Sequence, residues 1–286
     1  MRLFLLTALT MTAFAANSIL NRMAVAGGEM DAAGFAVVRV VAGAVVLAAL
    51  VAWRGGVVWP GWRGRAAGVA GLVLYLFGFS LAYGGLDAGT GALILFGSVQ
   101  VTMFAGALVS RDVVPARRWA GAGVAVLGLV VLLWPGGGAG PDPVHTAQMA
   151  AAGVGFGIFS LAGRGARDAL SATAANFVLA VPVMVLGAVV LPMDIAMASP
   201  RGLGLAVVSG AVTSGLGYAL WYAILPALGA SRAGVAQLTV PVIAAAGGAL
   251  ILAEPVGMRL VAGGALVLGG VLWASLAPRA RVTPRA

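Results

Sequence analysis

The stretch LDAGTGALILFGSVQVTMFAGALVSRDVVPARRWAGAGVAVLGLVVLLW, residues 86–134, recurs with substitutions at residues 228–276. The two copies align without a gap at a fixed offset of 142 residues. In each copy an apolar run ends near an acidic residue, Asp112 or Glu254, and a second apolar run with two glycines seven residues apart follows. Identical residues at equivalent positions are Leu86, Ala88, Gly106, Ala107, Leu108, Val114, Arg117, Ala120, Gly121 and Gly128 in the first copy, and Leu228, Ala230, Gly248, Ala249, Leu250, Val256, Arg259, Ala262, Gly263 and Gly270 in the second.

The same offset extends toward the start of each half. It pairs Phe14 with Phe156, and Phe35 with Phe177. Internal similarity at one fixed offset indicates that half of the chain is a copy of the other half.

Composition places the chain in a membrane. Of 286 residues, 62% are hydrophobic and 9% are charged, which leaves too few polar residues for the surface of a soluble globule. The net charge of +9 would suggest nucleic acid binding in a soluble domain. Here all 17 basic residues are arginines, and they lie mainly in short loops between apolar runs, so we expect no nucleic acid partner. The chain has no Cys and a single His, so neither disulfides nor a metal site is expected, and no cofactor is predicted.

The apolar runs predict an all-α integral membrane protein. Ten segments are each able to span about 30 Å of hydrocarbon. They cover residues 3–23, 32–53, 66–85, 88–110, 115–134, 145–163, 172–192, 203–225, 233–253 and 256–277. Glycines and prolines mark a seam, so we predict a first five-helix repeat at 1–135, a linker at 136–144, a second repeat at 145–278 and a tail at 279–286.

Five spans per repeat is an odd number, so the two repeats would enter the bilayer from opposite sides as inverted repeats. Such an architecture places a substrate site near the midplane, between the repeats. Arginines gather on the side that carries both predicted termini, which makes both termini cytoplasmic.

Several side chains within the spans are candidates for a substrate site. Tyr75, Phe79 and Tyr83 recur on one face of the third span, and Tyr218 and Trp221 cluster in the eighth. An aromatic-lined cavity with a few polar groups suits small amphipathic solutes. Tyr83 lies near the end of its span, so its alternative role is that of an aromatic belt residue at the membrane interface.

Polar residues and one proline complete the candidate site. Pro241 lies within the ninth span, where its ring frees the carbonyl of Gln237, so we predict a hinge at Pro241 and a substrate contact at Gln237. Asn17 and Gln100 add polar groups, although hydrogen bonds between helices explain each of them alone. Arg39 is a charge well inside a span, and we expect it to hold carbonyls or helix ends, or to snorkel.

The pattern resembles the drug/metabolite transporter superfamily in its ten-helix form with two EamA domains. The positions that carry the resemblance are residues 17–22, Arg39, Asp112, Gly121 and Gly128 in the first half, and residues 230–233, Pro241, Glu254, Gly263 and Gly270 in the second. The resemblance covers nearly the whole chain and is strongest to bacterial exporters of aromatic and neutral amino acids. It implies a cavity lined by the first, third, fourth, sixth, eighth and ninth helices, with the second helix and its Arg39 outside the cavity. Val99 stands opposite Pro241 in the repeat, so the matching proline break is missing from the fourth span.

We therefore expect a secondary transporter in a bacterial cytoplasmic membrane that exports neutral or aromatic amino acids by alternating access. A drug or other metabolite exporter of the same fold and a channel-like pore are the alternatives, and an enzyme is not expected. The expected partners are a small-molecule substrate and the lipid bilayer, and the oligomeric state stays open, with a monomer as one option. No Asp or Glu lies in the middle of a span, which favours facilitated diffusion or exchange over proton coupling.

Overall fold

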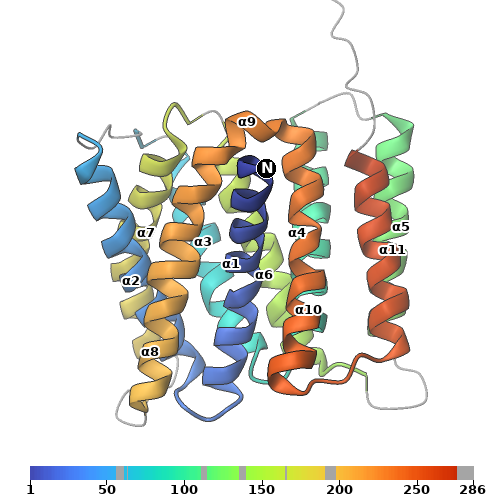
Figure 1. Ribbon diagram of the computed structural model, residues 1–286, viewed down its shortest axis with the longest axis horizontal. Coiled ribbons are helices and arrows are strands. Elements are labelled where there is room, and N and C mark those ends of the chain that lie inside the picture. The colour runs from blue at the N-terminus through green and yellow to red at the C-terminus, as the bar shows by residue number, and fades with distance from the viewer. Residues whose placement is uncertain are drawn as a thin grey trace, which may run out of the picture.

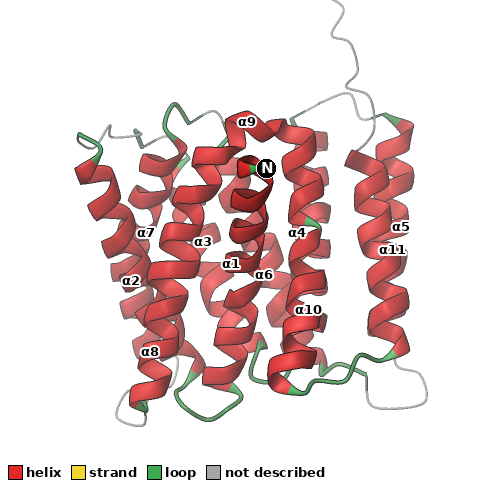
Figure 2. Ribbon diagram, in the orientation of Figure 1, coloured by secondary structure: helices red, strands yellow, loops and turns green. Residues whose placement is uncertain are grey.

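The computed structural model describes residues 1–55, 61–62, 64–110, 115–134, 140–164, 166–190 and 198–275, without the side chains of residues 118, 230, 231 and 275. Asp112, residues 136–139 of the predicted linker and the predicted tail at 279–286 lie outside these ranges. Within them every regular element is a helix, and the helices run roughly along one common direction (Figures 1 and 2).

The helices follow the predicted spans closely. In chain order they are α1 (Arg2–Val25), α2 (Ala32–Trp53), α3 (Arg65–Ala82), α4 (Ala88–Val109), α5 (Ala116–Leu133), α6 (Pro143–Ala162), α7 (Ala169–Val190), α8 (Pro200–Val208), the π-helix η2 (Ser209–Leu216), α9 (Gly217–Gln237), α10 (Thr239–Leu252) and α11 (Met258–Ser275). The predicted span at 203–225 corresponds to α8, η2 and the start of α9. The next span, at 233–253, corresponds to the end of α9 and α10.

Local sequence signals explain where several helices begin and turn. The side chains of Asp31, Asp142 and Ser199 accept hydrogen bonds from the backbone amides three residues later and cap α2, α6 and α8. Gly229 has φ 71°, a left-handed conformation that glycine adopts without a steric cost. At Gly229 the chain turns back at the end of the bundle where α1 starts (Figure 1).

The described helices are those of an integral membrane protein. Eight of them are long and apolar enough to cross a membrane, and two shorter apolar helices cover Trp119–Leu133 and Met258–Ala274. Large apolar side chains lie fully exposed on the outside, including Leu250 at 86% and Val190 at 85%. Such a surface is stable when lipid rather than water surrounds it.

Glycines, among them Gly121, Gly128, Gly263 and Gly270, allow close helix contacts. Gly121 on α5 lies against the carbonyl of Gly270 on α11, where an added Cβ would approach the oxygen to 2.5 Å. Gly263 makes the equivalent contact with the carbonyl of Gly128, at 3.0 Å from an added Cβ. Small residues of this kind let helix backbones pack closely in membranes.

Candidate functional site

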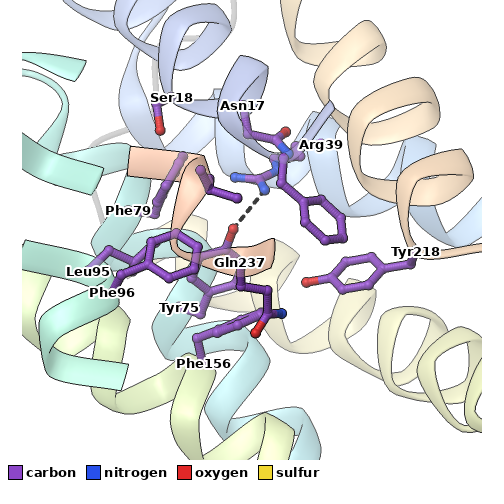
Figure 3. Close-up of a pocket in the computed structure, with 12 residues that line it drawn as sticks. Asn17, Ser18, Arg39, Tyr75, Phe79, Leu95, Phe96, Phe156, Tyr218 and Gln237 are labelled. Carbon is purple, nitrogen blue, oxygen red and sulfur yellow. Dashed lines mark hydrogen bonds between the residues drawn. The ribbon is translucent and has the colours of Figure 1, made fainter. Parts of the chain in front are cut away.

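A cavity lies at the centre of the bundle, bounded by helices from both halves of the chain (Figure 3). Its volume is about 40 Å³, enough for a few water molecules. The residues that line it are Phe14, Asn17 and Ser18 of α1, Arg39 of α2, Tyr75 and Phe79 of α3, Leu95 and Phe96 of α4, Phe156 of α6, Tyr218 and Gln237 of α9, and Val240 of α10.

Half of the twelve residues that line the cavity are aromatic. The ring of Tyr75 lies 5.4 Å from that of Phe79 and 5.0 Å from that of Phe156, measured between centroids. Phe14 and Tyr218 form a second contact, at 5.5 Å. Offset and edge contacts at these distances stabilise aromatic clusters and fix the ring positions. The aromatic part of the wall is therefore held in place by contacts between rings, and Asn17, Ser18, Arg39 and Gln237 add polar groups to the lining.

Asn17 is held between α1 and the π-helix. Its Oδ1 accepts hydrogen bonds from the Ser209 hydroxyl at 2.7 Å and from the Thr213 hydroxyl at 2.6 Å. Residues 209 and 213 come from η2, whose wider turn is a local departure from the α-helix that often marks functional sites. Asn17 thus lines the cavity while its amide oxygen ties two helices together.

Gln237 and Pro241 stand at an interruption of the helix. Helix α9 ends at Gln237 and α10 begins at Thr239, with Pro241 buried one turn along. A proline at position 241 has no amide to donate to the Gln237 carbonyl, which explains why the regular ladder breaks here. The Gln237 side chain lines the cavity, and the Tyr218 hydroxyl points toward it (Figure 3).

Arg39 corrects the expectation from sequence. Its side chain is 1% exposed, so it does not snorkel to the interface, and it lines the cavity rather than lying outside it. Its Nη2 donates to the Tyr75 hydroxyl at 3.0 Å, the bond drawn in Figure 3, and its Nε donates to the Ser214 hydroxyl at 3.2 Å. Helix α2 therefore contributes directly to the cavity.

Three candidate residues lie near the cavity without lining it. Tyr83 is buried beside Phe79, and its hydroxyl donates to the Ala88 carbonyl at 3.3 Å. Trp221 is 7% exposed and packs on Phe14 with Met11 and Val240 nearby. Gln100 is half-buried on α4 and is not among the lining residues.

Ionic contacts tie helix ends together at the end of the bundle where α1 and α10 end (Figure 1). Arg22, near the end of α1, forms an ion pair with Glu254 at 3.0 Å and another with Asp87 at 3.5 Å, and also donates to the Tyr83 carbonyl at 3.1 Å. Glu254 in turn accepts from the Ala88 amide at 2.8 Å. This group, Arg22, Asp87 and Glu254, is called the Arg22 cluster below. It joins the ends of α1, α4 and α10.

Two kinds of site residue escaped the sequence analysis. The hydroxyls of η2 appear in sequence as ordinary small polar residues, with no signal of the π-helix that gathers them at Asn17. Phe14 and Phe156 did carry a signal, because the repeat pairs them and both line the cavity. Among the described residues, no group of three or more His, Cys, Asp or Glu side chains is placed to hold a metal ion.

The fold and the cavity together define a polytopic helical membrane protein with an aromatic chamber at its centre. The chain belongs to the EamA-like transporter family, whose sequence profile matches residues 147–276. Membership makes it a membrane transporter of small substrates, in agreement with the resemblance to the drug/metabolite transporter superfamily.

Relatives extend the similarity over the whole chain. An uncharacterized protein of Pseudomonas aeruginosa is 42% identical over 281 residues, which cover 97% of this chain and 96% of the relative. An uncharacterized transporter of Archaeoglobus fulgidus is 42% identical over 69 residues, 24% of this chain and 25% of the relative. A solved crystal structure with 20% identity has a TM-score of 0.66 and covers 95% of this chain and 98% of its own, which shows a shared fold.

Proposed function

We propose that the protein is a secondary transporter that exports small amphipathic metabolites, with neutral and aromatic amino acids as the first substrate class. The central aromatic cavity carries this proposal. It offers flat apolar faces for a side chain, and the hydroxyl of Tyr218 and the amides of Asn17 and Gln237 for polar groups. A volume of about 40 Å³ is too small for an amino acid, so substrate entry requires the helices around the cavity to move apart.

The proposed architecture is ten crossings in two oppositely threaded repeats, residues 1–135 and 145–278. Two observations support this symmetry. The contact of Gly121 with Gly270 becomes that of Gly263 with Gly128 when the two repeats are exchanged. Phe14 and Phe156, paired by the repeat, both face the cavity. Inverted repeats that enclose a site at the midplane are a common basis of alternating access.

In this mechanism the Arg22 cluster closes one end of the cavity. The ion pair between Arg22 and Glu254 is largely shielded, with side-chain exposures of 22% and 10%. Because the cluster joins α1, α4 and α10, separating these helices breaks it. With cytoplasmic termini in a bacterial inner membrane, this end faces outward, and its opening releases the substrate outside the cell.

We propose that transport occurs by exchange or facilitated diffusion and is not coupled to protons. The acidic residues of the described ranges lie at helix ends or in loops: Glu29, Asp31, Asp87, Asp142, Asp168 and Glu254. A carboxylate in mid-membrane is the usual proton carrier of a coupled transporter. Substrate-driven alkalinisation or acidification of proteoliposomes would contradict this mode.

Counterflow in proteoliposomes tests the function. Vesicles that contain the purified protein are loaded with an unlabelled amino acid, and uptake of the labelled compound is followed over time. A carrier shows saturable, transient accumulation that depends on the internal substrate. A pore gives no counterflow, and counterflow with cationic drugs but not with amino acids would identify a drug exporter instead.

A further inference from the structure

Arg39 is a buried charge without a carboxylate partner among the residues that the structure describes. It is 1% exposed, and within the described part of the chain no acidic side chain lies within ion-pair distance of it. The cavity lining adds neutral residues only, so Arg39 gives this wall a net positive charge. An uncompensated charge in a low-dielectric interior is costly, which points to a partner that arrives from outside the protein.

Two of the three nitrogens of the Arg39 guanidinium donate hydrogen bonds within the described part of the protein, and the third does not. Tyr75 and Ser214 accept from Nη2 and Nε, and the carbon at the centre of the guanidinium lies 4.9 Å from the centroid of the Phe79 ring. Nη1 is buried without a hydrogen-bond partner among the described residues. Buried donors rarely stay unpaired, so this nitrogen is a candidate contact for a ligand.

A carboxylate is the anion that fits this site. Its two oxygens match the planar fork of a guanidinium, and its single negative charge balances the single positive charge of the wall. A phosphate dianion would leave an excess negative charge in an apolar cavity that offers no second cation among its lining residues.

We propose that Arg39 binds the carboxylate of the transported solute, and that the protein therefore selects monocarboxylates with an apolar or aromatic body. This inference rests on the proposed function, because it assumes that the cavity holds the solute. The rings of Phe14, Phe79 and Phe156 contact the body. Since the lining has no carboxylate for an ammonium group, an amino group is tolerated but not required, and simple cationic amines are excluded.

Binding of matched acid and amide pairs to the purified full-length protein tests the inference without transport. The probes are 3-phenylpropionate with 3-phenylpropanamide, and 4-methylpentanoate with 4-methylpentanamide, with affinity read from ligand-dependent thermal stabilisation in detergent. We expect each acid to bind about tenfold or more tightly than its amide, as a charge-assisted hydrogen bond predicts. Equal affinities, or no binding by any acid at millimolar concentration, would overturn the inference.

Variants assign the preference to Arg39. In Arg39→Gln the acid and the amide should bind with equal affinity, whereas Arg39→Lys keeps the charge and part of the preference. The matched control is Arg65→Gln. Arg65 is also buried, at 4% exposed, but it donates to the Ala172 carbonyl and Asn176 rather than lining the cavity. Its variant should keep the full preference.

Other outcomes separate the two proposals. If Arg39→Gln does not fold, Ser214→Ala, which removes the partner of Nε at a residue outside the cavity lining, should weaken acid binding more than amide binding. A preference that survives in Arg39→Gln contradicts the role of Arg39. Counterflow of amines or amides as rapid as that of acids would refute the inference and leave the transporter intact. Acid-selective binding without counterflow would refute the transporter alone.

Discussion

At the scale of single residues, the side chains that line the cavity differ in how far hydrogen bonds within the protein already occupy them. The amide oxygen of Asn17 is engaged by two hydroxyls of η2, so this group already has a structural task. Gln237 lies at a break between two helices and lines the cavity beside the Tyr218 hydroxyl (Figure 3). It is therefore the neutral side chain that we expect to contact the solute.

Replacement of Gln237 by Leu should raise the KM for transport by roughly threefold to tenfold, because one neutral hydrogen bond is lost. Insertion and yield should stay unchanged, since leucine suits a membrane helix. The matched control is Gln100→Leu, which makes the same substitution on α4 outside the cavity lining. Uptake kinetics in proteoliposomes check the pair, and unchanged kinetics in the Gln237 variant would remove this residue from the site.

Some of the residues that line the cavity could be predicted from the sequence, and others could not. Tyr75 and Phe79 were recognisable because aromatic residues four apart share a helix face. Arg39 also stood out as a charge inside a span, but sequence cannot distinguish a snorkelling arginine from one turned into a cavity. That difference depends on how α2 packs against α3 and η2, which is a property of the tertiary structure.

At the scale of elements, the helices were predictable because each must bury its backbone hydrogen bonds in lipid and therefore appears as a long apolar run. The π-helix η2 had no signal in the sequence, since its residues suit an α-helix equally well. The glycine contacts of α5 and α11 were predictable from their spacing, and they make a direct test of how these two helices pack.

The change Gly128→Ala should destabilise the protein by about 1–3 kcal/mol through overpacking. The added Cβ would lie 2.6 Å from the Val267 amide nitrogen and 2.8 Å from the Gly263 carbonyl oxygen. Gly123→Ala is the control on the same helix, because an added Cβ at Gly123 has no atom within 4 Å. Thermal unfolding in detergent compares the two variants. Equal stability of both would contradict the close packing of α5 and α11.

Asp168 at the start of α7 gives an expectation for pH. Burial opposes its ionisation, but hydrogen bonds from Ser171 and Leu170, together with the Arg54 charge at 2.9 Å, lower its pKa below the ordinary value of 3.8. A group with a lowered pKa stabilises the fold above its unfolded pKa, and this stabilisation is lost as the pH falls through the folded pKa. Asp168→Asn should therefore lower the melting temperature at pH 7, and this effect should shrink as the pH falls below 3.8 and through the folded pKa. A pH-independent difference would show that the charge of Asp168 does not contribute.

At the scale of the whole molecule, the proposed export of substrate depends on the orientation of the helix bundle in the membrane. The start of α1 and the end of α11 lie at the same end of the bundle (Figure 1). The distribution of arginines in the sequence predicts that this end is cytoplasmic. Because the natural chain has no Cys, single cysteines report accessibility without a background.

Cysteines at Trp62 and Pro141 test the orientation. Trp62 precedes α3 and Pro141 precedes α6, and these helices start at opposite ends of the bundle (Figure 1). In intact cells an impermeant maleimide should label Pro141→Cys, whereas Trp62→Cys should react only after the membrane is opened. Labelling of both from outside would refute the proposed threading, and the reversed pattern would invert the orientation.

The most direct test of the central claim is the accessibility of Ser18, which lines the cavity and is 3% exposed. An impermeant maleimide is applied to Ser18→Cys from each side of oriented membrane vesicles, with and without Arg22→Gln to weaken the Arg22 cluster. Alternating access predicts that the cysteine reacts from both sides, and that Arg22→Gln increases labelling from the outer side while decreasing it from the inner side. No reaction from either side, or labelling that Arg22→Gln leaves unchanged, would contradict a cavity that opens alternately to the two faces of the membrane.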